Sequence, residues 1–124
     1  MNANNWMLYG AYGYTGKLII EQAIKNGLNP TIAGRNPEKL IPLAKEKNLD
    51  YEVFDLNDQN RINRVLKEYD IIFNAAGPFK KTSLPIVEGC LENSAHYLDI
   101  TGEIGVFEQN FSLHEKALQK GIAI

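Results

Sequence analysis

The chain of 124 residues is poor in the residue types that mark disulfide-linked and metal-binding proteins. Cys90 is its single cysteine, so no internal disulfide can form, and no feature around it marks a nucleophilic thiol. The two histidines, His96 and His114, have no cysteine or carboxylate partners at the spacing of metal ligands. We therefore expect Cys90 to be a buried helix residue and expect no metal site.

Two further deficits exclude classes of partner. No apolar run approaches the length of a membrane span, and the first residues lack the basic start and apolar core of a signal peptide. The net charge of −2 leaves no broad basic field for nucleic acid. The composition, 44% hydrophobic and 23% charged, suits one globular domain. We expect a single soluble, cytoplasmic domain with neither membrane nor nucleic acid as a partner.

Apolar runs and turn residues alternate along the chain in a pattern typical of strands and helices. Strands are expected at 6–10, 31–35, 49–54, 70–75 and 96–100, with a sixth starting at 121–124. Helices are expected at 15–26, 37–47, 58–68, 84–93 and 105–120, the second capped by Asn36 and kinked or shortened by Pro42. This alternation predicts an α/β fold, a Rossmann-type doubly wound parallel sheet of about six strands in the order 3-2-1-4-5-6.

A glycine-rich stretch directly follows the first expected strand and leads into the first expected helix. Its spacing, G-x-x-G-x-x-G, is one residue longer in the first gap than the dinucleotide fingerprint, and glycines also serve ordinary turns. Its position between a strand and a helix favours a pyrophosphate bound at the helix N-terminus. The residues expected to bind cofactor here are Gly10, Tyr12, Gly13, Tyr14, Thr15 and Gly16.

The end of the second expected strand distinguishes NAD from NADP. An acidic residue there would bind the ribose 2′-hydroxyl and repel a 2′-phosphate, but this chain has Arg35 and Asn36, and no acid before Glu38. The guanidinium of Arg35 suits a phosphate, although a solvated surface arginine is the plain alternative. We therefore predict NADP(H) as the cofactor, with Arg35 and Asn36 beside its 2′-phosphate.

The ends of the third and fourth expected strands lie on the same sheet edge. Asp55 and Leu56 are expected to enclose the adenine, or else to serve as loop and cap residues. The small residues at the end of the fourth strand leave room for the ribose and nicotinamide, or else form only a tight turn: Asn74, Ala75, Ala76 and Gly77. The lysines that follow, Lys80 and Lys81, are interpreted as a solvated loop.

Four segments together resemble the saccharopine dehydrogenase-like oxidoreductase family. They are YGAYGYTG at 9–16, AGR at 33–35, FNAAGPF at 73–79 and YLDITGE at 97–103, and the nearest branch includes the saccharopine dehydrogenase-like oxidoreductases and trans-acting enoyl reductases. The resemblance implies an N-terminal NADP-binding domain followed by a larger α+β domain that completes the substrate site and often the homodimer. It also places five residues near the nicotinamide and the substrate: Phe79, Tyr97, Asp99, Thr101 and Glu103.

The function that these patterns favour is the cofactor-binding part of an NADP-dependent oxidoreductase acting on a small molecule. We expect residues 1–124 to form this domain, as the N-terminal part of a longer protein whose second domain is absent here. No tyrosine has a lysine four residues later, so the Tyr-x-x-x-Lys pair of short-chain dehydrogenases is missing, and no catalytic acid or base can be named. A stand-alone, non-catalytic NADP-binding or sensing module, or a flavin site on the same fold, remains open.

Overall fold

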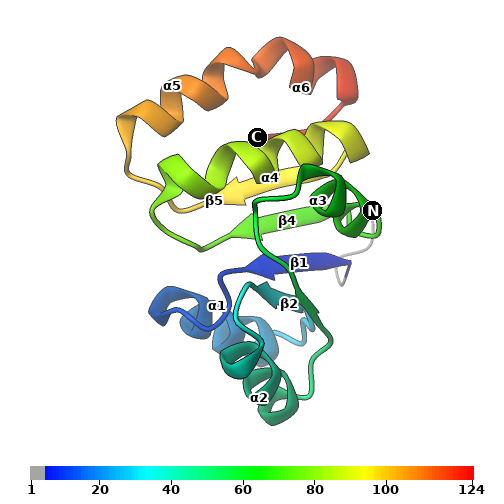
Figure 1. Cartoon of the computed structure of the whole chain (residues 1–124), viewed down its shortest axis with the longest axis vertical. Helices are drawn as coiled ribbons and strands as arrows, with labels where there is room; N and C mark the ends of the chain where they lie inside the picture. Colours follow the sequence, from blue (N-terminus) through cyan, green and yellow to red (C-terminus); the bar gives the residue numbers. More distant parts are fainter. Residues whose placement is uncertain (1–4) are drawn as a thin grey trace.

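The sheet is parallel and has the order predicted for its first five strands. The computed structural model describes residues 5–124, so the absence of a signal peptide, which was predicted from the first residues, concerns residues that lie mostly outside it. The strands pair in the order β3-β2-β1-β4-β5 (Figure 1). They are β1 Trp6–Tyr9, β2 Thr31–Gly34, β3 Tyr51–Val53, β4 Ile71–Asn74 and β5 His96–Asp99. The order reverses between β1 and β4, which is where a doubly wound fold binds its ligand.

Helices cover both faces of this sheet (Figure 1). On one face, Leu8 of β1 packs in a core with residues of α1 (Tyr14–Lys25) and α2 (Pro37–Lys47). On the other, Met7 and Tyr9 join a core with residues of α3 (Gln59–Leu66) and α4 (Phe79–Asn93). Successive side chains of a strand point to opposite faces, so the continuous apolar run of β1 is buried from both sides.

The C-terminal helix predicted at 105–120 is two helices, α5 (Ile104–Ser112) and α6 (His114–Lys120). They meet at Leu113, whose amide donates to the Asn110 carbonyl at 3.0 Å in a tighter turn. The half-buried Leu113 packs against the α3–α4 core, and that contact breaks the helix where no glycine or proline does. The outer surface of α5 leaves Ile104 and Phe111 more than 70% exposed, at 72% and 75%.

Helix α4 begins at Phe79, earlier than the start near Leu84 that the sequence predicts. The cause is a carboxylate from a distant segment. Glu103 accepts hydrogen bonds from the backbone N–H of Phe79 at 2.8 Å and of Lys80 at 3.3 Å. Because the first N–H groups of a helix have no partner within it, these two bonds stabilise a start that local sequence does not signal.

Two other expectations fail. Helix α2 is not shortened at Pro42 and extends from Pro37 to Lys47. The proline leaves the Glu38 carbonyl without its helical donor, but both residues are exposed, so water can take the place of that donor. No sixth strand forms within residues 5–124, although Ala123 accepts a hydrogen bond from the Tyr97 amide at 2.9 Å beside β5. The Ala123 amide donates instead to Nδ1 of His96 at 3.0 Å, so the ladder stops after one bond.

Candidate functional site

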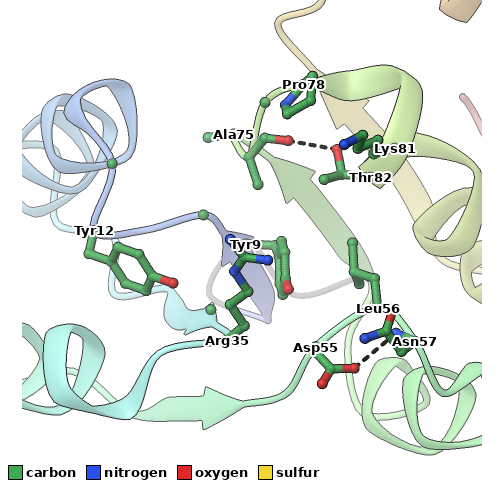
Figure 2. Close-up of a pocket in the computed structure, with 15 residues that line it drawn as sticks. Tyr9, Tyr12, Arg35, Asp55, Leu56, Asn57, Ala75, Pro78, Lys81 and Thr82 are labelled. Atoms are coloured by element: carbon green, nitrogen blue, oxygen red, sulfur yellow. Dashed lines mark hydrogen bonds between the residues drawn. The ribbon is translucent and has the colours of Figure 1, made fainter.

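A cavity of about 500 Å³ lies at the carboxyl ends of β1, β2 and β4, where the strand order reverses (Figure 2). It brings together most of the residues predicted to bind cofactor. Those that line it are Gly10, Tyr12, Gly13, Arg35, Asp55, Leu56, Ala75, Ala76 and Gly77. They come from four separate segments of the chain, so the fold assembles them at one edge of the sheet.

The turn after β1 owes its shape to Gly10. Its φ is +84°, and the amide donates to the Ala33 carbonyl of β2 at 3.0 Å. A Cβ at this position would lie 2.6 Å from the Ala76 amide nitrogen, so the turn touches the backbone that follows β4. A Cβ on Gly16 would collide with the carbonyl oxygens of Gly10 and Ala11. Both glycines are therefore required by the packing of the chain itself.

Gly13 is different, because nothing within the protein requires a glycine there. Its φ of −71° and ψ of 168° suit any residue, and the nearest atom to a Cβ at this position would be the Gly10 carbonyl oxygen at 3.5 Å. Gly13 is exposed, faces the cavity, and is the N-cap of α1 with no side-chain cap. The missing side chain leaves the first N–H groups of α1 open to a ligand, which is the geometry that binds phosphate.

The β2 side of the cavity carries an exposed cation, Arg35. It lies between Tyr12 and Tyr9 in the close-up (Figure 2) and directly precedes the N-cap of α2. Asn36 does not line the cavity, because its side-chain oxygen accepts the Glu38 amide at 3.0 Å and so caps the helix as predicted. The exposed guanidinium of Arg35 can therefore meet an anion that enters the cavity.

Other predicted cofactor residues lie outside the cavity lining. Tyr14 is 84% exposed at the start of α1, and Thr15 follows it in the same turn. Gly16 supports the helix from behind, and Asn74 is buried beneath the β4 turn. The contribution of these four residues to binding stays a prediction.

Sequence reasoning missed several lining residues: Tyr9, Gly34, Asn57, Pro78, Lys81 and Thr82. Lys81 was interpreted as part of a solvated loop, but the early start of α4 puts it in the first turn of that helix, beside the cavity (Figure 2). Tyr9 forms part of the floor and donates to the Phe54 carbonyl at 3.1 Å. Burial raises the pKa of Tyr9 to about 12, so the hydroxyl stays protonated at neutral pH.

The wall beyond β4 is held by hydrogen bonds that begin at Asn74. Its amide nitrogen donates to Oγ1 of Thr82 at 3.0 Å and to the Tyr97 hydroxyl at 3.1 Å, and its oxygen accepts the Ala76 amide at 3.0 Å. Thr82 in turn donates to the Ala76 carbonyl at 2.6 Å. Asn74 is fully buried, and these bonds satisfy its side chain while fixing the turn that forms the wall.

The same network continues through the residues that the family resemblance placed near the substrate. The Tyr97 hydroxyl donates to Asp99 at 2.8 Å, Asp99 accepts the Thr101 amide at 3.0 Å, and Thr101 accepts the Glu103 amide at 3.1 Å. Glu103 then caps α4. We call these five residues, Asn74, Tyr97, Asp99, Thr101 and Glu103, the β4–β5 clasp.

None of the clasp residues, nor Phe79, lines the cavity, and their proximity to nicotinamide and substrate stays a prediction. Burial raises the pKa of the Tyr97 hydroxyl well above its ordinary value, as it does that of the Cys90 thiol. Both groups are therefore protonated at neutral pH. Cys90 is fully buried in α4, as the sequence predicted.

Residues 5–124 contain no cluster of three potential metal ligands among His, Cys, Asp and Glu. Within the same residues, every helix is too short or too polar to cross a lipid bilayer.

Comparisons with known proteins identify relatives over nearly the whole chain. The sequence profile described as Saccharopine dehydrogenase NADP binding domain matches residues 6–124. A saccharopine dehydrogenase-like oxidoreductase of Bos taurus is 27% identical over 138 aligned residues, which cover 95% of this chain and 32% of that protein. A trans-acting enoyl reductase of Mycobacterium ulcerans is 30% identical over 128 aligned residues, which cover 95% of this chain and 30% of that protein. The resemblance seen in the sequence motifs and the choice of NADP are thereby confirmed.

A solved structure supports the fold. Apo saccharopine dehydrogenase (L-Glu forming) of Saccharomyces cerevisiae superposes with a TM-score of 0.80 at 19% identity, over 96% of this chain and 26% of that one. The Rossmann-type architecture is therefore shared. The chain spans about a third of the length of the curated relatives it matches.

The expected cytoplasmic localisation is contradicted by two relatives. One from Arabidopsis thaliana is named as probably mitochondrial, and one from Caenorhabditis elegans is named a lipid droplet localized protein. The expectation was wrong because it rested on missing signals. Compartment is set by short targeting segments and surface contacts that the composition of a folded domain does not report.

Proposed function

Because this chain belongs to the saccharopine dehydrogenase NADP-binding domain family, we propose that its cavity holds NADP(H) for hydride transfer to or from a small molecule. The proposal takes residues 1–124 as the N-terminal, cofactor-binding domain of a longer oxidoreductase. When bound, the nicotinamide supplies the hydride chemistry, and this chain's own residues hold and orient it.

The single observation that supports this function most strongly is that a glycine, Gly13, faces the cavity where the fold itself does not require one. The protein tolerates a Cβ there, and its conformation is ordinary, yet the residue is glycine and faces the cavity at the N-terminus of α1. A pyrophosphate lying against the first N–H groups of the helix would occupy the space that a side chain would fill. The residues present therefore fit the cofactor.

The remaining lining residues divide along the length of a dinucleotide. We assign the 2′-phosphate to Arg35, and the adenine to the space beside Asp55 and Leu56. The turn 75–77 after β4 would face the ribose and nicotinamide, with Thr82 behind it. Substrate would then enter beyond this turn, in the direction of the clasp residues, and a second domain would complete its site and form any homodimer.

Titration of the protein with NADPH and with NADH, followed by thermal unfolding, tests the cofactor assignment. A ligand at a hundredfold excess over its Kd stabilises the folded state by about 2.7 kcal/mol, which raises the Tm of a domain this size by roughly 10 °C. We expect a larger rise with NADPH than with NADH. No rise with either, or a rise only with a flavin nucleotide, would overturn the assignment.

Gly13→Val locates the site. We expect this variant to fold and to lose the rise with NADPH, because the side chain blocks the approach of the pyrophosphate. Gly105→Ala is the matched control, since a Cβ there meets no atom within 4 Å and lies on α5, away from the cavity. A Gly13→Val protein that kept the full rise would place the dinucleotide elsewhere.

A stand-alone, non-catalytic NADP-binding module is the second candidate. One observation favours it: no tyrosine in the chain has a lysine four residues later, so Tyr9 and Tyr12 in the cavity lining lack the partner with which short-chain dehydrogenases transfer a proton. Hydride transfer from NADPH by the full-length protein, seen as loss of nicotinamide absorbance with a panel of carbonyl and enoyl compounds, would decide for the enzyme. Binding without turnover would favour the module.

A further inference from the structure

Tyr12 lines the cavity and also contacts residues at the end of β2 and the start of α2. Its hydroxyl accepts a hydrogen bond from the backbone N–H of Asn36 at 3.2 Å. That N–H belongs to the peptide group that joins Arg35 to Asn36, so the bond restrains the backbone on which the Arg35 side chain stands. A residue of the turn after β1 is thus tied to the turn after β2. Figure 2 shows the Tyr12 side chain beside Arg35.

Two further residues, Gly34 and Lys39, contact the Tyr12 ring. A Cβ on Gly34 would lie 2.5 Å from Cε1 of Tyr12, so the ring occupies the space that a side chain at the end of β2 would take. On α2, Nζ of Lys39 lies 5.8 Å from the ring centroid, a cation–π contact. The ring is therefore held between the glycine turn, the end of β2 and the first turn of α2.

We propose that Tyr12 is a positioning residue for the 2′-phosphate: it fixes the Arg35 turn relative to the pyrophosphate-binding turn, and so sets the preference for NADPH over NADH. The inference rests on the proposed function, in which Arg35 meets the 2′-phosphate. Arg35 is exposed, and a turn that moves freely loses backbone conformational entropy when its arginine binds a phosphate. A turn fixed in advance by Tyr12 reduces that loss.

The proposal predicts an effect on one dinucleotide and not on the other. NADH has no 2′-phosphate and makes no use of Arg35 as a phosphate ligand. Both cofactors use the pyrophosphate turn equally. Loss of the Tyr12 hydrogen bond should therefore weaken the binding of NADPH alone. A general destabilisation of the domain would weaken the binding of both dinucleotides to the same extent.

The test is calorimetric titration of wild type and Tyr12→Phe with NADPH and NADH. Loss of one neutral hydrogen bond predicts about three- to tenfold weaker binding of NADPH, with NADH unchanged. The control is Tyr51→Phe, which removes a hydroxyl from a half-exposed residue of β3 outside the cavity and should leave both affinities unchanged. Gly34→Ala should displace the Tyr12 ring from the end of β2, and should likewise lower the ratio of NADPH affinity to NADH affinity.

A double-mutant cycle with Arg35→Gln shows whether Tyr12 acts through Arg35. In that background Tyr12→Phe should no longer change NADPH affinity, because the group it positions is gone. An unchanged NADPH-to-NADH ratio in Tyr12→Phe overturns the inference while leaving the proposed function intact. So does an equal loss for both dinucleotides, or a full effect that persists without Arg35. A wild-type protein that binds neither dinucleotide overturns the proposed function, and this inference with it.

Discussion

The two walls of the cavity are built in different ways. The wall at β1 and β2 consists of backbone turns, with glycines where chains touch and one tyrosine bridging to the Arg35 turn. The wall at β4 and β5 is held by the clasp, a chain of side-chain hydrogen bonds from Asn74 to Glu103. The first wall carries the groups that would recognise the cofactor. The second keeps a turn and a helix start in place.

Because of this difference, mutations in the two walls should change different measured quantities. Changes at the clasp remove buried or helix-capping hydrogen bonds and should lower the free energy of unfolding. Changes at Gly13 should alter ligand affinity at nearly constant stability, and loss of the Tyr12 hydroxyl should alter affinity while also lowering the free energy of unfolding by about 1 kcal/mol, because the Asn36 amide loses its partner. Mutations where the two walls meet, at the contact between Gly10 and Ala76, should strongly lower both stability and ligand affinity.

Gly10→Val should have the largest effect, because it breaks the contact between the walls. The positive φ at this residue is strained for a β-branched side chain, and its Cβ would meet the Ala75–Ala76 backbone within 2.8 Å. We expect about 3 kcal/mol or more of destabilisation from strain and overpacking together. Urea unfolding measures it. Gly102→Ala, where a Cβ meets nothing within 4 Å, should leave the free energy of unfolding nearly unchanged. Equal losses of unfolding free energy in the two variants would contradict the importance of the contact between Gly10 and Ala76.

Tyr97→Phe should have an intermediate effect confined to the clasp. It removes the hydroxyl that accepts from Asn74 and donates to Asp99, at a cost of about 1–2 kcal/mol in unfolding free energy. The NADPH-to-NADH affinity ratio should not change, because Arg35 lies on the other wall. A change in that ratio would show that the walls are coupled.

The same variant should alter stability at alkaline pH. The folded state raises the pKa of Tyr97 and raises that of Tyr9 to about 12, so above pH 10 the unfolded chain releases these protons first. Stability should therefore begin to fall near pH 9, where the Cys90 thiol of the unfolded chain ionises, and fall more steeply above about pH 10, where the tyrosines of the unfolded chain follow. Tyr97→Phe should show a shallower fall than wild type in the same urea titrations.

Glu103→Ala should have the smallest effect, because the cap that it removes lies near solvent. Loss of the acceptor for the Phe79 and Lys80 amides predicts about 1 kcal/mol of destabilisation. Glu103→Gln keeps an acceptor oxygen without the charge and should lose about half of that. Amide hydrogen exchange should become faster in the first turn of α4 and stay unchanged in α1. Uniform acceleration throughout the domain would argue against a local cap.

The different construction of the walls also explains which features could be predicted from the sequence. The glycine turn, the Arg35 position and the Asn36 cap are local patterns, each set by residues within a few positions of one another. The strand order followed from the alternation of strands and helices, which leaves few topologies. These predictions concern the β1–β2 half and the sheet, where short-range chemistry determines the structure.

What escaped prediction depends on contacts between distant segments. The start of α4 at Phe79 relies on Glu103, separated from it by 24 positions. Lys81 was misassigned as a consequence, because its place in the lining depends on where that helix begins. The break at Leu113 likewise depends on packing against the core of another helix pair, and no turn residue marks it.

The contact between Gly10 and Ala76 constrains how such domains can diverge. The turns after β1 and β4, separated in the chain by three helices and three strands, are in van der Waals contact, with no space for a side chain on Gly10. Neither turn can acquire bulk, lengthen or shift by natural selection unless the other changes in step. We therefore expect substitutions at position 10 and in the 75–76 pair to occur together among related chains, and a bulky residue at position 10 beside an unchanged 75–76 turn to be rare.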